Sequence, residues 1–185
     1  MIEVEKRFQL TDEQEKAMLE GAEFLGEKLV HDIYYDYPDY RMMKKDIRLR
    51  KRNDKFELKV KKSAGVNQEI ENEKEIARYF NLSDSISDFV EKNLVKLIEY
   101  NTLRKKYKKG DFNIDIDNTD FNYKLCEIEL LVDKDSDVKS ATTQIKELAQ
   151  KFGFENQKTL PKRVAFLKKF KIEVYNELYG NKNTG

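Results

Sequence analysis

Hydrophobic and charged residues alternate along several short stretches of the chain, a pattern typical of β-strands with one apolar and one charged face. In the first stretch, Ile2 and Val4 would lie on one side and Glu3 on the other. The alternation is clear in residues 2–8, 46–52, 56–61, 112–117 and 124–132, and less regular in 32–36, 71–77 and 102–108. Short links favour antiparallel pairing, and Asn53 and Asp54 predict a hairpin turn. We therefore predict about eight antiparallel strands.

Hydrophobic residues at helical spacing fill the intervals between these strands. Thr11 and Gln14 have the spacing of a capping box, which predicts a short helix towards residue 20. Gly153 is a typical helix stop, and Pro161 is a typical residue near a helix start. Longer helices are predicted for residues 85–100, 138–152 and 162–178. The sequence thus predicts a single α+β domain over residues 1–178 and a disordered tail at 179–185.

The amino-acid composition limits the kinds of ligand and macromolecule that the chain is expected to bind. The 36 basic residues balance 35 acidic ones, so no net field favours nucleic acid or an acidic membrane. The basic run at residues 105–109 is interpreted as part of a strand rather than as a nucleic-acid patch. Cys126 is the only cysteine and His31 the only histidine, which excludes a disulfide framework and the usual thiolate and imidazole metal sites.

The chain also lacks the sequence features of an exported or membrane-spanning protein. Its first residues are acidic and do not resemble a signal peptide. No apolar run approaches the roughly 18 residues that a membrane span needs. We therefore expect a soluble cytoplasmic protein, monomeric by default, whose partner is a small molecule and not nucleic acid or a membrane.

Charges of one sign occupy whole strand faces. The acidic pairs are Glu3/Glu5, Asp115/Asp117 and Glu127/Glu129, and the basic groups are Arg48/Arg50/Arg52, Lys59/Lys61 and Arg104/Lys106. An ordinary sheet with its charged face in water would accommodate any one of these strands. Because like charges on one face repel, the whole set favours a closed eight-stranded barrel with the charges inside and helices packed outside. Carboxylate pairs there could hold a hard cation, and arginines and lysines could bind phosphate oxygens.

These motifs resemble those of a known family. The similarity runs from residue 2 to about residue 178, and it rests on motifs that follow one another in the expected order. They are Glu3-Val4-Glu5-Lys6-Arg7, Tyr34-Tyr35-Asp36-Tyr37-Pro38, the arginine strand, Phe56-Glu57-Leu58-Lys59, Lys74-Glu75, Arg104, Asp115-Ile116-Asp117-Asn118-Thr119-Asp120-Phe121, Glu127-Ile128-Glu129 and Pro161-Lys162. Together they resemble the CYTH, or triphosphate tunnel metalloenzyme, superfamily. Within it, the resemblance is strongest to the animal thiamine-triphosphatases.

The resemblance implies an activity and a set of site residues. The activity is the Mg²⁺- or Mn²⁺-dependent hydrolysis of the terminal phosphate of a triphosphate, most readily thiamine triphosphate. The implied metal ligands are Glu3, Glu5, Asp115, Asp117, Glu127 and Glu129. The implied substrate-binding residues are Arg7, Arg48, Arg50, Arg52, Lys59, Glu75, Arg104 and Lys162, and the implied catalytic residues are Glu5, Arg7 and Tyr34. In the arginine strand, Arg48 with Arg50 could take the place of Arg50 with Arg52.

Two departures from the family pattern bear on mechanism and substrate. Arg7 stands where the family has a lysine, and arginine stays protonated in proteins. We therefore interpret Arg7 as a phosphate-binding or electrostatic residue and leave the general base unassigned. The chain has no tryptophan, and Arg48 stands where thiamine-specific members carry one.

The missing tryptophan leaves other substrates and functions open. It favours inorganic tripolyphosphate as an alternative substrate, although Tyr34, Tyr37 or Tyr40 could still offer an aromatic face. A related adenylate cyclase activity and a non-catalytic polyphosphate-binding module are further alternatives.

Overall fold

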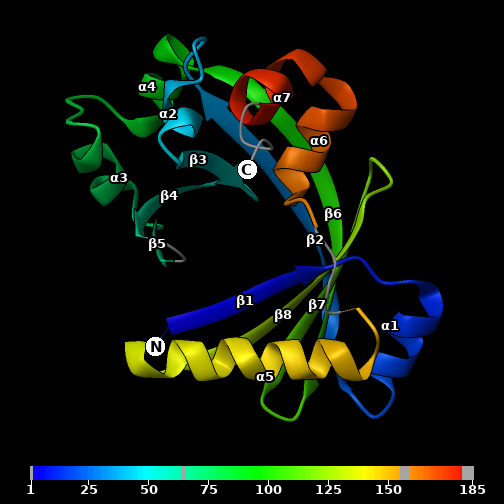
Figure 1. Ribbon diagram of the computed structural model, residues 1–185. Coiled ribbons are helices and arrows are strands. Elements are labelled where there is room, and N and C mark those ends of the chain that lie inside the picture. Colours follow the sequence, from blue (N-terminus) through cyan, green and yellow to red (C-terminus); the bar gives the residue numbers. More distant parts are fainter. Residues whose placement is uncertain (1, 64–65, 155–158, 181–185) are drawn as a thin grey trace. The chain divides into compact units, whose positions relative to one another are not determined.

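The computed structural model describes residues 2–63, 66–154 and 159–180, without the side chains of 62–67. The strands are β1 (Ile2–Phe8), β2 (Glu23–Asp36), β3 (Ile47–Arg52), β4 (Lys55–Ser63), β5 (Val66–Ile70), β6 (Val95–Lys109), β7 (Phe112–Thr119) and β8 (Lys124–Val132). The helices are α1 (Asp12–Leu19), α2 (Arg41–Lys44), α3 (Glu73–Tyr79), α4 (Ile86–Asn93), the 3₁₀ turn η1 (Asp135–Asp137), α5 (Val138–Lys151), α6 (Lys162–Phe170) and α7 (Ile172–Tyr179). Figure 1 shows these elements along the chain.

The eight strands form one sheet in the order β1-β8-β7-β6-β2-β3-β4-β5. Every strand pair whose register is described is antiparallel. The predicted α+β class and the eight antiparallel strands are therefore confirmed. The strand order ends at β1 and β5, and closure of the sheet into a barrel stays a prediction.

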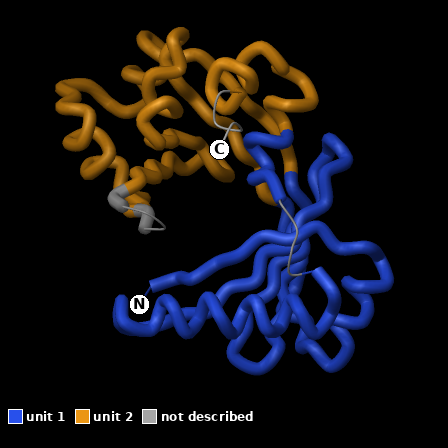
Figure 2. The backbone as a smooth tube through the Cα atoms, in the orientation of Figure 1, with its two compact units in different colours: residues 1–29, 102–165 blue, residues 30–101, 166–185 orange. Residues whose placement is uncertain are grey.

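The chain divides into two compact units, drawn in different colours in Figure 2. Unit 1 comprises residues 1–29 and 102–165, and unit 2 comprises residues 30–101 and 166–185. The long strands β2 and β6 each contribute one part to unit 1 and the other part to unit 2. Each unit has its own hydrophobic core and its own charged sheet face.

In unit 1, α5 covers the apolar face of the sheet, and Figure 1 shows it running along β1 and β8. Val4 and Ile128 are buried on that face against Ala141 and Ile145 of α5. Burying a large aliphatic side chain such as Ile128 contributes about 2 kcal/mol. The small alanines let the helix lie close to the sheet, so the charged side chains of the same strands are left on the opposite face. Cys126 is buried in this core, as a small hydrophobic residue would be.

The predicted capping box at the start of α1 is confirmed. The Gln14 backbone N–H donates to Thr11 Oγ1 over 3.2 Å, and the Thr11 N–H donates to Gln14 Oε1 over 3.0 Å. These two bonds satisfy N–H groups that have no partner within the helix. They fix the start of α1 directly after β1.

In unit 2, the apolar face of β3 and β4 is buried by short helices. Leu49, Leu58 and Ile76 are completely buried there. Met42 and Met43 are buried in α2. The Asp36 carboxylate holds them in place, because it accepts from both of their backbone N–H groups.

Several element boundaries differ from the sequence prediction. Residues 71–77 were predicted as a strand, but most of them form α3, because the Asn72 side chain accepts from the Lys74 and Glu75 N–H groups and starts a helix. The strand in this region is instead β5, which precedes it. The helix predicted for residues 85–100 ends at Asn93, and β6 follows from Val95.

The predicted last helix breaks at Lys171, which leaves α6 and α7 as separate helices. The disordered tail predicted for 179–185 begins on described residues, since Tyr179 ends α7, and its residues 181–185 lie outside the described part.

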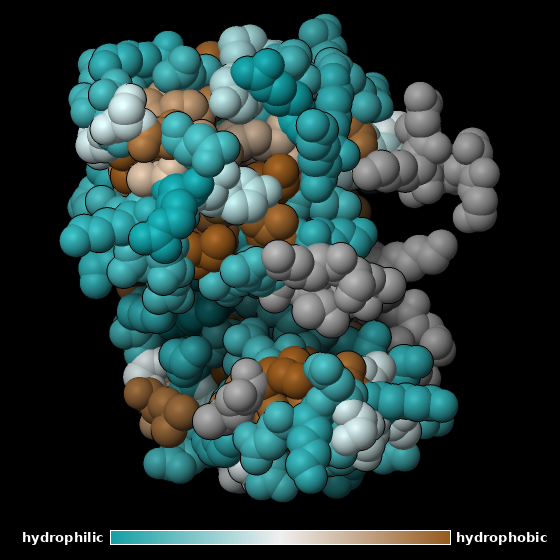
Figure 3. Space-filling model, turned by 90° about the vertical axis from the view of Figure 1, so that its left-hand side faces the viewer, coloured by the Kyte–Doolittle hydropathy of each residue, from teal (hydrophilic) through white to brown (hydrophobic). Residues whose placement is uncertain are grey.

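The surface reflects the high charge content of the chain, in which 38% of residues are charged. The face in Figure 3 is mostly hydrophilic, and hydrophobic side chains show there in separate patches. Among the described helices, none is long and apolar enough to cross a membrane.

Candidate metal and phosphate sites

The charged face of unit 1 is a ladder of directly opposed side chains. Arg7 of β1 is opposite Glu127 of β8, which is opposite Asp115 of β7, which is opposite Lys106 of β6. Because paired residues of neighbouring strands share a face, these four lie in one row across the sheet. The strand alternation that predicted charged faces is thereby confirmed for this unit.

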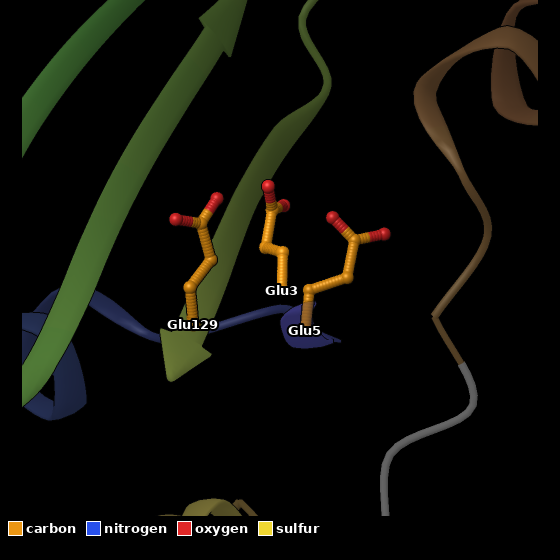
Figure 4. A group of neighbouring side chains, drawn as sticks. All are labelled: Glu3, Glu5 and Glu129. Carbon is orange, nitrogen blue, oxygen red and sulfur yellow. The ribbon is translucent and has the colours of Figure 1, made fainter. Parts of the chain in front are cut away.

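Three carboxylates of this face form a group that could hold a metal ion. Glu3 and Glu5 of β1 and Glu129 of β8 each offer one carboxylate oxygen, and these oxygens lie within 4.8 Å of one another. Glu5 is directly opposite Glu129 in the β1–β8 pair. Figure 4 shows the three side chains pointing the same way from their strands.

Crowding of the three carboxylates shows in a raised pKa of Glu129. Burial, together with the negative charges of Glu3 and Asp115, raises the pKa of Glu129 to about 7. A hard divalent cation prefers carboxylate oxygens and would relieve this repulsion. The donor set of Glu3, Glu5 and Glu129 therefore fits Mg²⁺ or Mn²⁺.

The other three predicted metal ligands, Asp115, Asp117 and Glu127, are buried and paired with cations. Arg104 donates to Asp117 from Nε and from Nη2, each over 2.7 Å, and from Nη2 to Glu127 over 2.8 Å. Its Nη1 lies 2.6 Å from Asp115 Oδ2. The buried Lys162 also donates to Asp117. The structure thus divides the six predicted ligands into Glu3, Glu5 and Glu129 on one side and Asp115, Asp117 and Glu127 on the other.

These ion pairs keep two of the carboxylates ionised in spite of their burial. Desolvation favours the neutral acid, but Arg104 and Lys162 outweigh it and lower the pKa of Asp117. For Glu127, Arg7, Lys162 and Arg104 outweigh desolvation in the same way and lower the pKa. Both are therefore negative at neutral pH and hold their cations on the sheet face.

Arg7 joins the two groups of carboxylates in unit 1. Its Nε donates to Glu127 Oε1 over 2.9 Å, and its Nη2 donates to Glu5 Oε1. An arginine here carries a fixed positive charge and cannot act as a base. The structure thus places Arg7 among the candidate metal ligands, and its role in substrate binding stays a prediction.

The charged face of unit 2 places two arginines among carboxylates. Arg52 of β3 donates to Asp32 of β2 from Nε over 2.8 Å and from Nη2 over 3.1 Å. Arg50 donates from Nε to Glu57 over 2.6 Å and from Nη2 to Glu69 over 3.2 Å. The side chains of Arg50 and Arg52 keep 16% and 25% of their surface exposed, enough to contact a ligand.

The remaining predicted residues of unit 2 occupy different positions. Arg48 lies on the same face as Arg50 and is directly opposite Lys59, whose Nζ is 3.6 Å from Glu69. Tyr34 is directly opposite Arg50 and accepts from its Nη1 over 3.4 Å. Glu75 lies exposed on α3, a helix in place of the predicted strand. All three arginines share one face, so both predicted registers remain compatible with the strand.

Sequence reasoning missed the carboxylates that hold the arginines of unit 2. They are Asp32, Glu57 and Glu69, and Asp32 is completely buried. The alternation in residues 32–36 placed Asp32 on a strand face, and that was the available signal. The pairing could not be derived from it, because the register between β2 and β3 depends on a chain reversal of some ten residues.

Comparisons with known proteins cover most of the chain. A sequence model of the CYTH domain family matches residues 1–163. Human thiamine-triphosphatase is 27% identical in an alignment 205 positions long, which covers 96% of this chain and 89% of that protein. Thiamine-triphosphatase from Macaca fascicularis matches with the same identity and coverage.

Solved structures show the same fold. The PH1819 protein from Pyrococcus horikoshii OT3 matches with a TM-score of 0.66 and 21% identity, covering 91% of this chain and 99% of that one. A putative adenylyl cyclase from Hippeastrum, reported to have a dominant triphosphatase activity, matches with a TM-score of 0.54 and 17% identity over 95% and 94% of the two chains.

Proposed function

The chain belongs to the CYTH domain family, and from that premise we propose that it is a metal-dependent hydrolase of triphosphate compounds. The observation that carries the proposal is the carboxylate group of Glu3, Glu5 and Glu129. The group fits a hard divalent cation, and two arginines on the charged face of unit 2 keep part of their surface exposed. The similarity to thiamine-triphosphatases supports the same class of reaction.

The reaction is the attack of water on the terminal phosphorus. The P–O bond to the middle phosphate breaks, the electron pair leaves with the diphosphate oxygen, and orthophosphate and a proton are released. Phosphoryl transfer needs mainly positioning and neutralisation of charge. A Mg²⁺ or Mn²⁺ ion held by Glu3, Glu5 and Glu129 would supply Lewis-acid stabilisation of phosphate oxygens.

The protein cations have the complementary task. On the charged face of each unit, cations would bind negative phosphate oxygens: Arg50, Arg52 and Lys59 in unit 2, and Arg104 and Lys162 in unit 1. Because an arginine stays protonated, Arg7 would stabilise negative charge and not remove the proton of the attacking water.

For the substrate, we propose thiamine triphosphate first and inorganic tripolyphosphate second. The likeness to thiamine-triphosphatases favours the former. One observation favours the latter: Tyr34 is only 7% exposed and its ring lies 6.3 Å from that of Tyr100, so it offers little aromatic surface to an organic group. Tyr37 is also occupied, since the Arg41 guanidinium lies 3.4 Å from its ring centre.

A product panel tests this proposal. Purified protein is incubated with thiamine triphosphate, tripolyphosphate or ATP, each with Mg²⁺ or Mn²⁺, and the products are identified by chromatography. Orthophosphate from either of the first two supports the hydrolase, and their relative kcat/KM decides between them. Cyclic AMP and pyrophosphate from ATP would instead indicate a cyclase. No product from any of the three would overturn the proposal in favour of a binding module.

A further inference from the structure

Two arginines on the charged faces are held in the same way. Arg52 is directly opposite Asp32 in the β2–β3 pair, and Arg104 is directly opposite Asp117 in the β6–β7 pair. In both pairs the arginine donates from Nε to Oδ1 and from Nη2 to Oδ2, over 2.7 to 3.1 Å. One arrangement thus occurs independently in unit 2 and in unit 1.

The aspartate and the arginine of each pair differ in solvent exposure. Asp32 and Asp117 are both 0% exposed, whereas the side chains of Arg52 and Arg104 keep 25% and 13% of their surface exposed. A fully buried carboxylate cannot contact a substrate, but the guanidinium in front of it can. Each aspartate therefore lies behind an arginine that reaches the solvent.

The bidentate hydrogen bond from each arginine lets the aspartate fix the orientation of the guanidinium. A single contact would leave the guanidinium free to rotate, but two parallel hydrogen bonds fix the orientation of its plane. Buried ion pairs are often replaceable by hydrophobic residues without loss of stability, so these pairs are poorly explained as stabilising elements. Fixing a long side chain before the ligand arrives removes an ordering cost from binding.

We propose that Asp32 and Asp117 are positioning residues: Asp32 holds Arg52 in unit 2, and Asp117 holds Arg104 in unit 1, each in an orientation that binds phosphate oxygens. The inference rests on the proposed function for the role of the two arginines. It reassigns Asp117, which is 0% exposed and accepts from both Arg104 and Lys162, from metal ligand to positioning residue. Glu3, Glu5 and Glu129 remain the candidate metal site.

Kinetics of Asp32→Asn test the unit 2 pair. The amide keeps the shape of the side chain but can accept from only one of the two Arg52 nitrogens. KM for the triphosphate substrate should rise about tenfold, with kcat changed less than about twofold, because uniform binding is lost. Asp32→Glu keeps the charge but moves it by one methylene, and it should also raise KM. Asp54→Asn, on the same hairpin with its side chain 94% exposed, is the matched control.

Non-additivity separates positioning from a general loss of fold. Arg52→Lys removes the fork while keeping the charge, and it should raise KM by itself. In that background, adding Asp32→Asn should change KM by less than about twofold, because the two residues act together. Independent, multiplicative effects of the two substitutions would contradict the proposal.

Metal titration tests the unit 1 pair without relying on activity. In calorimetric titrations with Mn²⁺, Asp117→Asn should leave the affinity within about threefold of wild type, while Glu129→Gln weakens it more than about tenfold. Tripolyphosphate binding, titrated without metal, should weaken about tenfold in Asp117→Asn. Loss of Mn²⁺ binding in Asp117→Asn equal to that in Glu129→Gln would make Asp117 a metal ligand and overturn the inference.

The outcomes also separate this inference from the proposed function. If wild-type protein neither hydrolyses nor binds any triphosphate, the proposed function fails and the positioning role fails with it. If wild-type protein is active and both asparagine variants match it in KM and in tripolyphosphate affinity, only the positioning role fails.

Discussion

Glu129 shows how the neighbours of one side chain set its ionisation. Burial and the charge of Glu3 raise its pKa from the ordinary 4.5 to about 7. Well below pH 4.5 the group is neutral in folded and unfolded chains, so its ionisation does not change the stability. Between 4.5 and 7 the folded protein keeps a proton that the unfolded chain has lost, so stability falls as the pH rises.

This predicts a pH-dependent effect of Glu129→Gln. The glutamine has no charge to desolvate, so in the presence of a chelator the variant should gain stability relative to wild type as the pH rises from 5 to 8. Urea unfolding at pH 5, 6, 7 and 8 measures the difference. A difference that is constant over this range would show that the pKa of Glu129 is not raised.

The same ionisation predicts a pH-dependent affinity for metal. A divalent cation binds the ionised carboxylate, so below pH 7 the affinity for Mn²⁺ should fall by up to about tenfold per pH unit. Calorimetric titrations at pH 6 and pH 8 measure it. Glu3→Gln removes a charge that raises the pKa of Glu129, so the metal affinity that remains should depend less on pH. An unchanged pH profile in Glu3→Gln would contradict this coupling.

The candidate site could be predicted from the sequence in part. The carboxylate pairs on alternating strands indicated a metal-binding face, and Glu3, Glu5 and Glu129 do lie together. Which carboxylates pair with cations could not be predicted, because that depends on strand register. Asp117 lies opposite Arg104, and no local spacing reveals it.

The β3–β4 hairpin depends on the backbone conformation of its two turn residues. Asn53 and Asp54 both adopt positive φ, 45° and 69°, which is the left-handed geometry of a two-residue hairpin loop. Glycine at the second position avoids the cost that a side chain adds there. Asp54→Gly should therefore stabilise the protein by about 0.5–1 kcal/mol, since its exposed pair with Lys51 contributes little.

Urea unfolding of Asp54→Gly measures this gain. The matched control is Lys55→Gly, one residue further on in β4, where extended backbone gains nothing from glycine and stability should fall. Equal effects of the two substitutions would show that the left-handed geometry is not the cause.

A single carboxylate anchors α2. Asp36 is completely buried and accepts from the N–H groups of Tyr37, Met42 and Met43 over 2.7, 3.1 and 2.8 Å. Asp36→Ala would leave these donors without their acceptor and should cost about 2–4 kcal/mol. Thermal and urea unfolding measure the loss.

A neighbouring aspartate provides the control for this prediction. Asp39, whose side chain is 61% exposed, should tolerate alanine with a change of less than about 0.5 kcal/mol. A small effect of Asp36→Ala, comparable to that of Asp39→Ala, would mean that α2 does not depend on this anchor.

The predictability of the elements followed the strength of the local signal. Regular alternation located β1, β3, β4, β7 and β8, and the capping box located α1. Residues 94–100 were predicted as helix because Leu94, Leu97 and Ile98 also fit a helical stripe. The apolar residues of a short run fit both the helical and the strand period, so strand pairing within the sheet determines which of the two structures forms.

The charges of the whole chain nearly cancel. The net charge therefore does not indicate how the charged residues are distributed over the structure. The formal net charge is +1, yet unit 1 groups carboxylates on β1 and β8 and unit 2 groups arginines on β3. The family could be predicted because its motifs are spread over the chain in a fixed order, and the match to residues 1–163 confirms it. Closure of the sheet stays a prediction, since strand alternation specifies faces and not which edges meet.

The carboxylate group of Glu3, Glu5 and Glu129 is proposed to be the metal site of a triphosphate hydrolase. Initial rates of orthophosphate release from thiamine triphosphate and tripolyphosphate, with Mg²⁺ and with Mn²⁺, test it in wild type, Glu5→Gln and the exposed control Glu147→Gln. We predict that Glu5→Gln lowers kcat/KM at least about 100-fold with the fold intact by circular dichroism, while Glu147→Gln matches wild type. Metal-dependent release by Glu5→Gln at the wild-type rate would contradict the account.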